Sequence, residues 1–291
     1  VRYVLEGSVR KTGDTVRITT QLADAVSGRH LFSERYDRDF RDILTVQDEI
    51  TMKVLAAVQV VLTKGEVAQL SEKEPKNLQA YLSVLKSQKY NQQFNRESVA
   101  LARRHAEEAI AQDPEYSGAY RALAAVMINS TFVGAAQASD PETRRQALML
   151  AERAVALDPT SSSYFILSLV HVFFSQDPEK ARAAAERSIA LSPNSAAAYQ
   201  CMGASLMLAE RYHEAIPYFE KSLRLSPIPV TAGVMSMLGN SLRFTGRYVE
   251  AIAVYRRMLT IYPNNIFGHA MLACTYATVG RHAEARAEAA E

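Results

Sequence analysis

The sequence predicts a mostly α-helical fold, a solenoid of repeated helix pairs that follows a small α+β segment. Two patterns support this prediction: a proline-ended phrase that recurs along most of the chain, and a two-residue alternation of apolar side chains near its start. Hydrophobic residues make up 48% and charged residues 22% of the 291 positions, which argues against disorder. A chain of this length is more than one compact core usually holds, unless it is a repeat array.

The recurring phrase divides the chain at nearly constant intervals. Five phrases, AEEAIAQDP, AERAVALDP, AERSIALSP, FEKSLRLSP and YRRMLTIYP, close at prolines that lie 45, 34, 34 and 36 residues apart. An insertion of about 11 residues around Ser130–Asp140 explains the longest interval, and its Ser, Ala and Gly content predicts a long loop between paired helices. The prolines are Pro114, Pro159, Pro193, Pro227 and Pro263.

The segment Ala196–Pro229 shows the repeat pattern most clearly. Its small residues, Gly203 and Ala215, fall where two antiparallel helices would cross, and large residues such as Phe219 would fill the seam between helices. In the preceding repeat, the spacing places Leu169 at the position of Gly203. An ordinary helical bundle is the alternative, but it would not place alanine and proline at fixed offsets so often.

This pattern resembles the tetratricopeptide repeat, whose period is 34 residues. The resemblance covers roughly Leu78–Glu291 and implies about five repeats and a truncated sixth, each a pair of antiparallel helices. We expect the repeats at 78–116, 117–161, 162–195, 196–229, 232–265 and 266–291.

The segment 1–77 has a different period. Val16, Ile18 and Leu22 alternate with polar residues, which predicts a strand. We expect three antiparallel strands and one helix, near Arg2–Arg10, Thr15–Asp24, Arg29–Tyr36 and Ile43–Leu62. Residues 1–62 resemble the second half of the TolB-like amino-terminal domain, which precedes tetratricopeptide repeats in bacterial class III adenylate/guanylate cyclases and in some winged-helix regulators. Half of such a domain would leave an open strand edge, so we expect self-association through residues 1–62.

The resemblance to tetratricopeptide repeats also implies a binding surface. In that family the first helix of each pair lines a concave groove that binds a protein or peptide. The corresponding positions are apolar in the middle and polar at the edges, which suits a helix or an extended apolar peptide; the alternative is that some of them pack under the next repeat. A terminal-carboxylate clamp known in some family members is not reproduced. The candidate groove residues are Arg121, Asn129, Ile166, Val170, Phe173, Phe174, Gln200, Ala204, Met207, Leu208, Ser236, Asn240, Arg243 and Phe244.

No catalytic, metal-binding or cofactor-binding motif is recognisable. The six histidines are scattered without metalloprotease spacing, and no Gly-rich phosphate loop or Cys-x-x-Cys motif occurs. Cys201 and Cys274 fall inside predicted helices, where lone cysteines are usually small core residues. The net charge of +2 without a dense basic stretch gives no reason to expect nucleic acid as a partner, and no run of 18 apolar residues predicts a membrane span.

These observations favour a non-catalytic interaction scaffold that takes no cofactor. We expect it to be the regulatory C-terminal region of a bacterial adenylate/guanylate cyclase in the cytoplasm, with the periplasm left open. The same module in a winged-helix transcriptional regulator is the alternative, and an enzyme with unrecognised chemistry is a third. The residues that precede Val1 would separate the first two, and an activity screen addresses the third.

Overall fold

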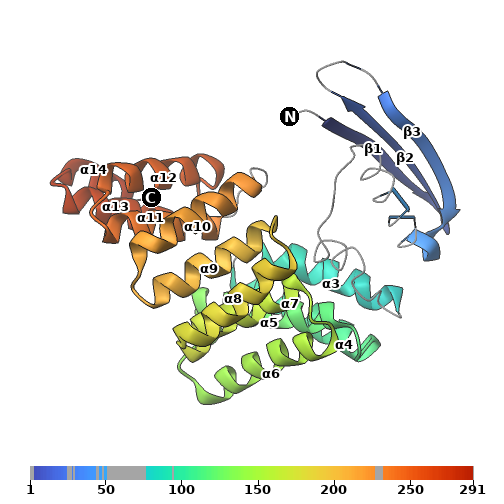
Figure 1. Ribbon diagram of the computed structural model, residues 1–291, viewed down its shortest axis with the longest axis horizontal. Helices are drawn as coiled ribbons and strands as arrows, with labels where there is room; N and C mark the ends of the chain where they lie inside the picture. Colours follow the sequence, from blue (N-terminus) through green and yellow to red (C-terminus); the bar gives the residue numbers. More distant parts are fainter. Residues whose placement is uncertain are drawn as a thin grey trace. The chain divides into compact units, whose positions relative to one another are not determined.

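A computed structural model describes residues 3–24, 28, 30–43, 46–47, 49–50, 77–93, 95–226 and 232–290. The chain divides into two compact units, Val1–Thr63 and Lys64–Glu291. The first unit contains the sheet and the second contains the helices (Figure 1). The division after Thr63 falls 14 residues before the boundary expected after residue 77 (77 − 63 = 14), and the repeat boundaries inside the second unit stay a prediction.

Three antiparallel strands form the sheet of the first unit, as predicted. The order is β1 (Tyr3–Thr12), β2 (Thr15–Asp24) and β3 (His30–Asp39), followed by the short 3-10 helix η1 (Phe40–Asp42). On the central strand β2, alternate side chains are buried because one face of the sheet is covered: Val16 and Ile18 form a small core with Tyr36 and Val46. Most of the helix predicted at 43–62 lies outside the described residues.

The outer strand β1 differs from β2, because every side chain described from Val4 to Thr12 is exposed. Val9 lies opposite Ile18 and Leu5 lies opposite Leu22 in the antiparallel register, so both face the same side as the small core. They are nevertheless 70% and 51% exposed. Among the described residues, β1 therefore pairs on one side only, and the apolar side chains of Val9 and Leu5 beside its other edge are uncovered.

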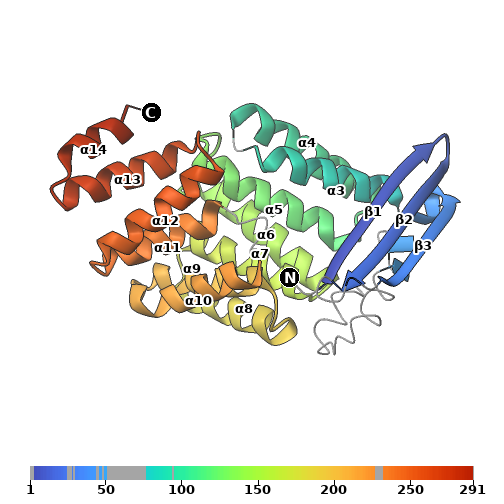
Figure 2. The same ribbon diagram turned by 90° about the horizontal axis from the view of Figure 1, so that it is seen from above.

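The second unit is a stack of antiparallel helix pairs, with a first and a second helix in each pair (Figures 1 and 2). First helices of neighbouring pairs also contact each other, more than successive second helices do. This is the tetratricopeptide-like solenoid that the sequence predicts. The helices are α3 (Leu78–Asn91), α4 (Arg96–Gln112), α5 (Ser117–Phe132), α6 (Pro141–Leu157), α7 (Ser161–Val170), α8 (Pro178–Leu191), α9 (Ala196–Leu208), α10 (Tyr212–Leu225), α11 (Ala232–Phe244), α12 (Tyr248–Ile261), α13 (Ile266–Thr278) and α14 (His282–Glu288).

Small residues allow the two helices of a pair to approach closely, as expected. A Cβ atom on Gly203 would lie 2.6 Å from the ring of Phe219, and one on Gly239 would lie 2.4 Å from the ring of Tyr255. Both rings are fully buried. The glycines therefore make room for the aromatic side chains of the second helices, and this packing forms the continuous core of the unit.

The insertion in the second repeat is only partly a loop. Helices α5 and α6 contain 16 and 17 residues, against 13 and 14 in α9 and α10. The connection between α5 and α6 is 133–140, so the first residues of the loop expected at Ser130–Asp140 belong to α5. Longer helices bury more apolar surface than a loop could, so most of the inserted residues extend the stack.

The third repeat has a different register from the one predicted. Ser168, not Leu169, takes the place of Gly203: it is fully buried and its Oγ donates a hydrogen bond to the backbone oxygen of Ala181 at 2.7 Å. The helix α7 starts one residue early, because its N-cap Thr160 directly follows Pro159. In the other pairs whose turn is described, one further residue separates the proline from the N-cap, as in Pro193-Asn194-Ser195.

A short π-helix restores the register before the second helix of this pair. The π-helix η2 (His171–Ser175) continues α7 and ends at Gln176, whose φ of 50° is left-handed. Ser168 and Ala181 lie 13 positions apart, whereas Gly203 and Ala215 lie 12 apart. The π-helix accommodates the additional residue. This repeat thus has one residue fewer before α7 and one residue more in η2. The two differences cancel, so the interval from Pro159 to Pro193 stays at 34 residues.

Candidate protein-binding surface

The candidate surface is formed by the side chains of the first helices that are not buried in the core. We call it the first-helix face, and it comprises the exposed and half-buried side chains of α3, α5, α7 with η2, α9, α11 and α13. Twelve of the fourteen residues expected from the family resemblance lie on these α-helices, and Phe173 and Phe174 lie in η2.

Four of the fourteen expected residues are core residues, which corrects the prediction for them; one is Ala204, which is 3% exposed. Ile166, Val170 and Phe174 are 7%, 0% and 1% exposed. Because the third repeat starts one residue early, its positions correspond to those of α9 at an offset of 35 rather than 34. Sequence reasoning therefore placed residues of the buried side of α7 on the binding surface.

The offset of 35 identifies the residues that replace them. Phe165 corresponds to Gln200, Leu169 to Ala204, Val172 to Met207 and Phe173 to Leu208. In the first, third and fourth of these pairs both side chains are half-buried, and in the second both are buried, so the exposure agrees at all four positions. The first-helix face of this repeat therefore includes Phe165, Val172 and Phe173.

Several of the remaining expected residues already make contacts within the unit. The Asn129 side chain donates to the backbone oxygen of Asn91 at 3.2 Å, and Tyr255 donates to Asn240 Oδ1 at 2.7 Å. The Arg121 guanidinium donates to Thr160 Oγ1 at 3.4 Å. These polar groups are partly used for packing. The half-buried residues of the expected set are Arg121, Asn129, Phe173, Gln200, Met207, Leu208, Ser236, Asn240 and Arg243, while Ala204 is buried and Phe244 is exposed.

Large apolar side chains gather where the first helices end. Phe132, Leu208 and Phe244 are the last residues of α5, α9 and α11, and Phe173 lies in the π-helix that ends the third first helix. Phe132 is 51% and Phe244 is 54% exposed. Because these four residues occupy the same end of successive stacked helices, we call them the apolar strip.

Two aromatic contacts tie the apolar strip to its neighbours. The ring of Phe132 meets that of Phe173 edge to face, with 5.2 Å between centroids. Phe244 stacks on Tyr212, the first residue of the second helix of the neighbouring pair, at 4.7 Å, and the Arg243 guanidinium lies 4.5 Å from the same ring. Such contacts hold large rings in a fixed orientation. Sequence reasoning missed Phe132, because α5 runs three residues beyond the length of α9.

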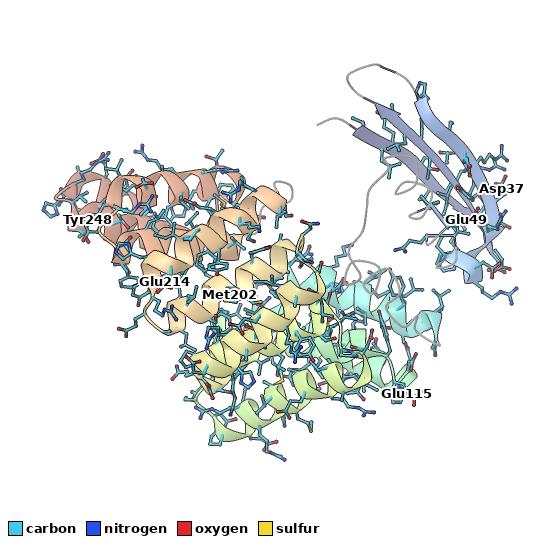
Figure 3. The ribbon with its side chains drawn as sticks, viewed as in Figure 1. Asp37, Glu49, Glu115, Met202, Glu214 and Tyr248 are labelled. Carbon is cyan, nitrogen blue, oxygen red and sulfur yellow. The ribbon has the colours of Figure 1, made fainter. Side chains whose placement is uncertain are left out.

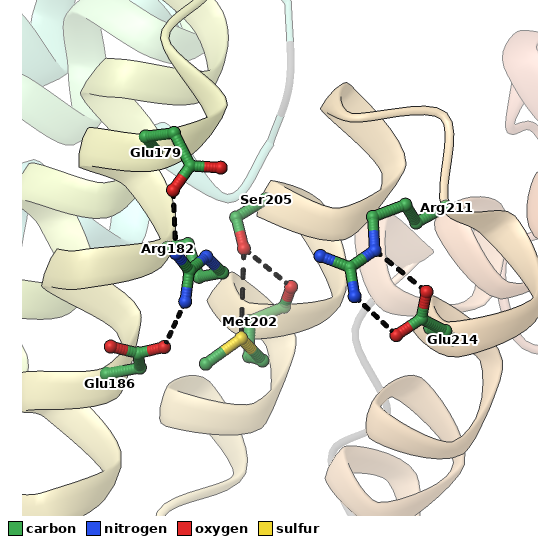
Figure 4. A network of polar contacts seen from close by, with 7 residues as sticks. All are labelled: Glu179, Arg182, Glu186, Met202, Ser205, Arg211 and Glu214. Atoms are coloured by element: carbon green, nitrogen blue, oxygen red, sulfur yellow. Dashed lines mark hydrogen bonds and ion pairs between the residues drawn. The ribbon is translucent and has the colours of Figure 1, made fainter.

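The second helices present a different surface, made of ion pairs. Arg182 binds Glu179 and Glu186 at 2.6 and 2.7 Å, and Arg211 binds Glu214 at 2.6 Å (Figure 4; Glu214 is also labelled in Figure 3). The arginine beside it holds the pKa of the Glu214 carboxyl below its usual range. The same pairing recurs at Arg247–Glu250 and Arg281–Glu284. These exposed pairs add little stability each, but they neutralise the charge of the second helices.

Comparison with known proteins agrees with this geometry. A tetratricopeptide-repeat family matches residues 194–264. A thermophilic TPR protein of Thermus thermophilus, TTC0263, has a solved structure that superposes with a TM-score of 0.51 at 20% identity, over 62% of this chain and 92% of that one. The helical unit therefore has the fold of a tetratricopeptide-repeat solenoid, and its residues 194–264 match the family itself.

Two further similarities are partial. "Putative adenylate cyclase 3" of Rhizobium meliloti (strain 1021) is 37% identical over 158 residues, which make up 54% of this chain and 27% of that protein. The chain thus corresponds to little more than a quarter of that relative. The structure titled "MamA AMB-1 P212121" matches with a TM-score of 0.43 at 26% identity, over 58% of this chain and 92% of that one.

A buried thiol lies inside the solenoid at Cys201, whereas Cys274 is exposed. Burial raises the pKa of the Cys201 thiol to about 12, so it stays protonated and unreactive at neutral pH. Within the described ranges, no three His, Cys, Asp or Glu side chains gather as metal ligands. Among the same residues, no helix is both long and apolar enough to cross a bilayer.

The described part of the solenoid also has a depression on its surface. It has a volume of about 360 Å³ and lies between α4, α5 and α6. Its floor is apolar, with Leu123, Met127 and Leu150, and its rim is charged. The rim charges lie within ion-pair distance of one another, as in Arg145–Glu142 at 2.7 Å and Arg103–Glu107 at 3.7 Å. This arrangement offers no unsatisfied group to a small ligand.

Proposed function

We propose that this chain is a non-catalytic interaction scaffold that binds a segment of a partner protein along its first-helix face. The main support is the apolar strip, where Phe132 and Phe244 are more than half exposed at the ends of stacked helices. A soluble surface rarely gathers large exposed aromatic side chains at equivalent positions unless they bind something. Buried aromatic and aliphatic side chains contribute most of the energy of protein interfaces.

The proposal is tested by substitutions that remove exposed apolar side chains at two kinds of position. Phe132→Ala and Phe244→Ala remove side chains of the apolar strip, whereas Val249→Ala removes an apolar side chain that is 82% exposed on the second helix α12. Partners are captured with the purified chain and identified by mass spectrometry, and thermal melting is measured in parallel. We expect the two strip variants to lose captured partners that Val249→Ala retains.

The melting measurement separates binding from folding. Phe244→Ala loses its stacking on Tyr212, which is worth about 0.5–1.5 kcal/mol, so the unit should stay folded. Equal capture by all three variants would refute the first-helix face as the binding surface. A collapse of melting in the strip variants would assign these residues to packing instead.

We further infer that the interaction serves cyclic-nucleotide signalling in the cytoplasm, as the regulatory region of a nucleotide cyclase. The support is the similarity to the putative adenylate cyclase of Rhizobium meliloti together with the resemblance of residues 1–62 to a TolB-like domain that occurs in such cyclases. The chain alone should then form no cyclic AMP or cyclic GMP from ATP or GTP.

A chimaera tests this regulatory role. The matched segment of the Rhizobium meliloti protein is replaced by this chain, with and without Phe244→Ala, and cyclic AMP is measured. We expect the chimaera to form cyclic AMP at a rate that the substitution changes. The same rate in the chimaera, in its variant and after deletion of the segment would contradict a regulatory role and would favour the alternative of a transcriptional regulator.

A further inference from the structure

The first helices of the solenoid contain no acidic residue. None of α3, α5, α7, η2, α9, α11 and α13 includes Asp or Glu, although the chain has 31 acidic residues among 291. Their four Lys and Arg side chains, by contrast, are Lys86, Lys89, Arg121 and Arg243. Apart from histidine, the charged side chains of the first-helix face are therefore all cationic.

Helix formation does not require this asymmetry. Glutamate and lysine have nearly the same helix propensity, and each second helix, from α4 to α14, contains at least one glutamate. On those helices arginine and glutamate occur together, three or four residues apart, and pair within about 2.6–3.7 Å. The absence of carboxylates is thus specific to the side of the solenoid that presents the apolar strip.

Three cations of the first helices, Lys86, Lys89 and Arg243, form no ion pair with a described residue, whereas several cations of the second helices do. Lys86 and Lys89 are exposed, and neither forms an ion pair with any described residue. Arg243 lies over the Phe244 ring and has no carboxylate partner in the described ranges, and its Nε is buried without a hydrogen-bond acceptor. The positive charges without a carboxylate partner therefore include sites on α3, which precedes the helices of the apolar strip, and on α11, where the strip ends.

We propose that the partner segment is acidic as well as apolar: a peptide whose large apolar side chains contact the apolar strip and whose Asp or Glu side chains reach Lys86, Lys89 and Arg243. This rests on the proposed function, because it specifies the ligand of the same surface. Four helix-to-helix steps separate α3 from α11, at about 8–10 Å each. An extended peptide at about 3.3 Å per residue needs roughly ten to twelve residues to span them.

The test uses the full chain and an array of twelve-residue peptides with four large apolar residues in varied order. Each peptide is made in three forms, with Glu, Gln or Lys at its four charged positions. Binding is measured by fluorescence anisotropy at low and at physiological salt. We expect Glu forms to bind about tenfold more tightly than Gln forms and Lys forms not to bind, with the preference for Glu weakening as salt increases.

Two double variants with the same change in net charge locate the effect. Lys86→Glu with Lys89→Glu reverses two charges on the first-helix face, whereas Arg187→Glu with Arg257→Glu reverses two exposed charges on second helices. We expect the first pair of substitutions to weaken the Glu peptides about tenfold and the second pair to leave them nearly unchanged. Circular dichroism confirms that each variant is folded.

The outcomes separate this inference from the function on which it rests. Equal binding of Glu, Gln and Lys forms, lost in Phe244→Ala, would overturn the acidic preference and leave the scaffold function intact. An equal effect of the two double variants would mean that only net charge matters, which also overturns it. If no apolar peptide binds in any form, the scaffold function itself is refuted.

Discussion

A methyl group added at Gly203 probes how closely the two helices of one repeat cross. In the structure, the Cβ of an alanine there would lie 2.6–2.8 Å from three ring carbons of Phe219. Real Cβ atoms essentially never come so near another carbon, so the ring would have to move. It is fully buried and packed on all sides, and close-packed interiors yield little.

The expected effect follows from two opposing terms. Glycine in a helix interior is about 1 kcal/mol less favourable than alanine, so Gly203→Ala gains that amount. Overpacking a well-packed core costs about 1–3 kcal/mol, so the net expectation is a loss of up to about 2 kcal/mol. Gly233→Ala is the matched control, since a Cβ there would meet nothing within 4 Å and the substitution keeps any gain in helix propensity.

Urea unfolding followed by circular dichroism measures both variants. We expect a lower midpoint for Gly203→Ala and an unchanged or higher midpoint for Gly233→Ala. In a background of Phe219→Leu, which shortens the opposing side chain, Gly203→Ala should become neutral or stabilising, because coupled neighbours are not additive. If Gly203→Ala raises the midpoint as much as Gly233→Ala does, the close crossing inferred here is wrong.

Three further predictions address other parts of the chain. Phe174→Ala should cost about 3–5 kcal/mol in urea unfolding, because the ring is 1% exposed; a loss no larger than that of Phe244→Ala would contradict its burial. Burial lowers the pKa of His171, and the negative charge of Asp177 partly offsets this shift. The unfolded state therefore binds the proton more readily, so the stability should fall as pH decreases below the ordinary histidine pKa of about 6.5. His171→Gln should flatten the melting temperature between pH 7.5 and 5, and an unchanged slope would exclude this histidine as the cause. Val9→Lys places a charge beside the open edge of β1 and should reduce the self-association expected for residues 1–62, as measured by light scattering; a parent chain that is monomeric at high concentration would contradict that expectation.

The features that recur with a period were predictable from the sequence. The two-residue alternation around Val16 and Ile18 predicts β2 with its observed bounds, Thr15–Asp24. The offset of Gly203 from Ala215 predicts the helix crossing, because small residues are needed wherever two backbones approach. Such patterns can be recognised in a sequence because the same packing requirement recurs at regular intervals along the chain.

The errors arise where one repeat departs from the average. The proline interval before Pro193 is 34 residues, which conceals the early start of α7 and the extra residue in η2. The N-cap is the local signal that could have shown it: Thr160 follows Pro159 directly, and N-caps favour Ser, Thr, Asp and Asn. Exposure at a particular position depends on this register, so three residues of the candidate surface were assigned to the wrong side of their helix.

The extra residue in η2 has a function of its own in packing, because it is what buries Phe174. Deletion of Val172 would leave 12 positions between Ser168 and Ala181, as between Gly203 and Ala215, and the π-turn could become an ordinary α-turn. Phe174 would then move to the half-buried position now held by Phe173, and its buried site would be empty.

We therefore expect the deletion to cost about as much as Phe174→Ala, roughly 3–5 kcal/mol, and the two changes together to cost little more than either alone. Deletion of the exposed Ser139 in the connection 133–140 is the control and should cost less. Urea unfolding of the three single variants and the combined variant decides the matter. Additive losses would mean that η2 and Phe174 stabilise the solenoid independently, and a deletion that leaves the midpoint unchanged would show that the α-helical register was available to this repeat all along.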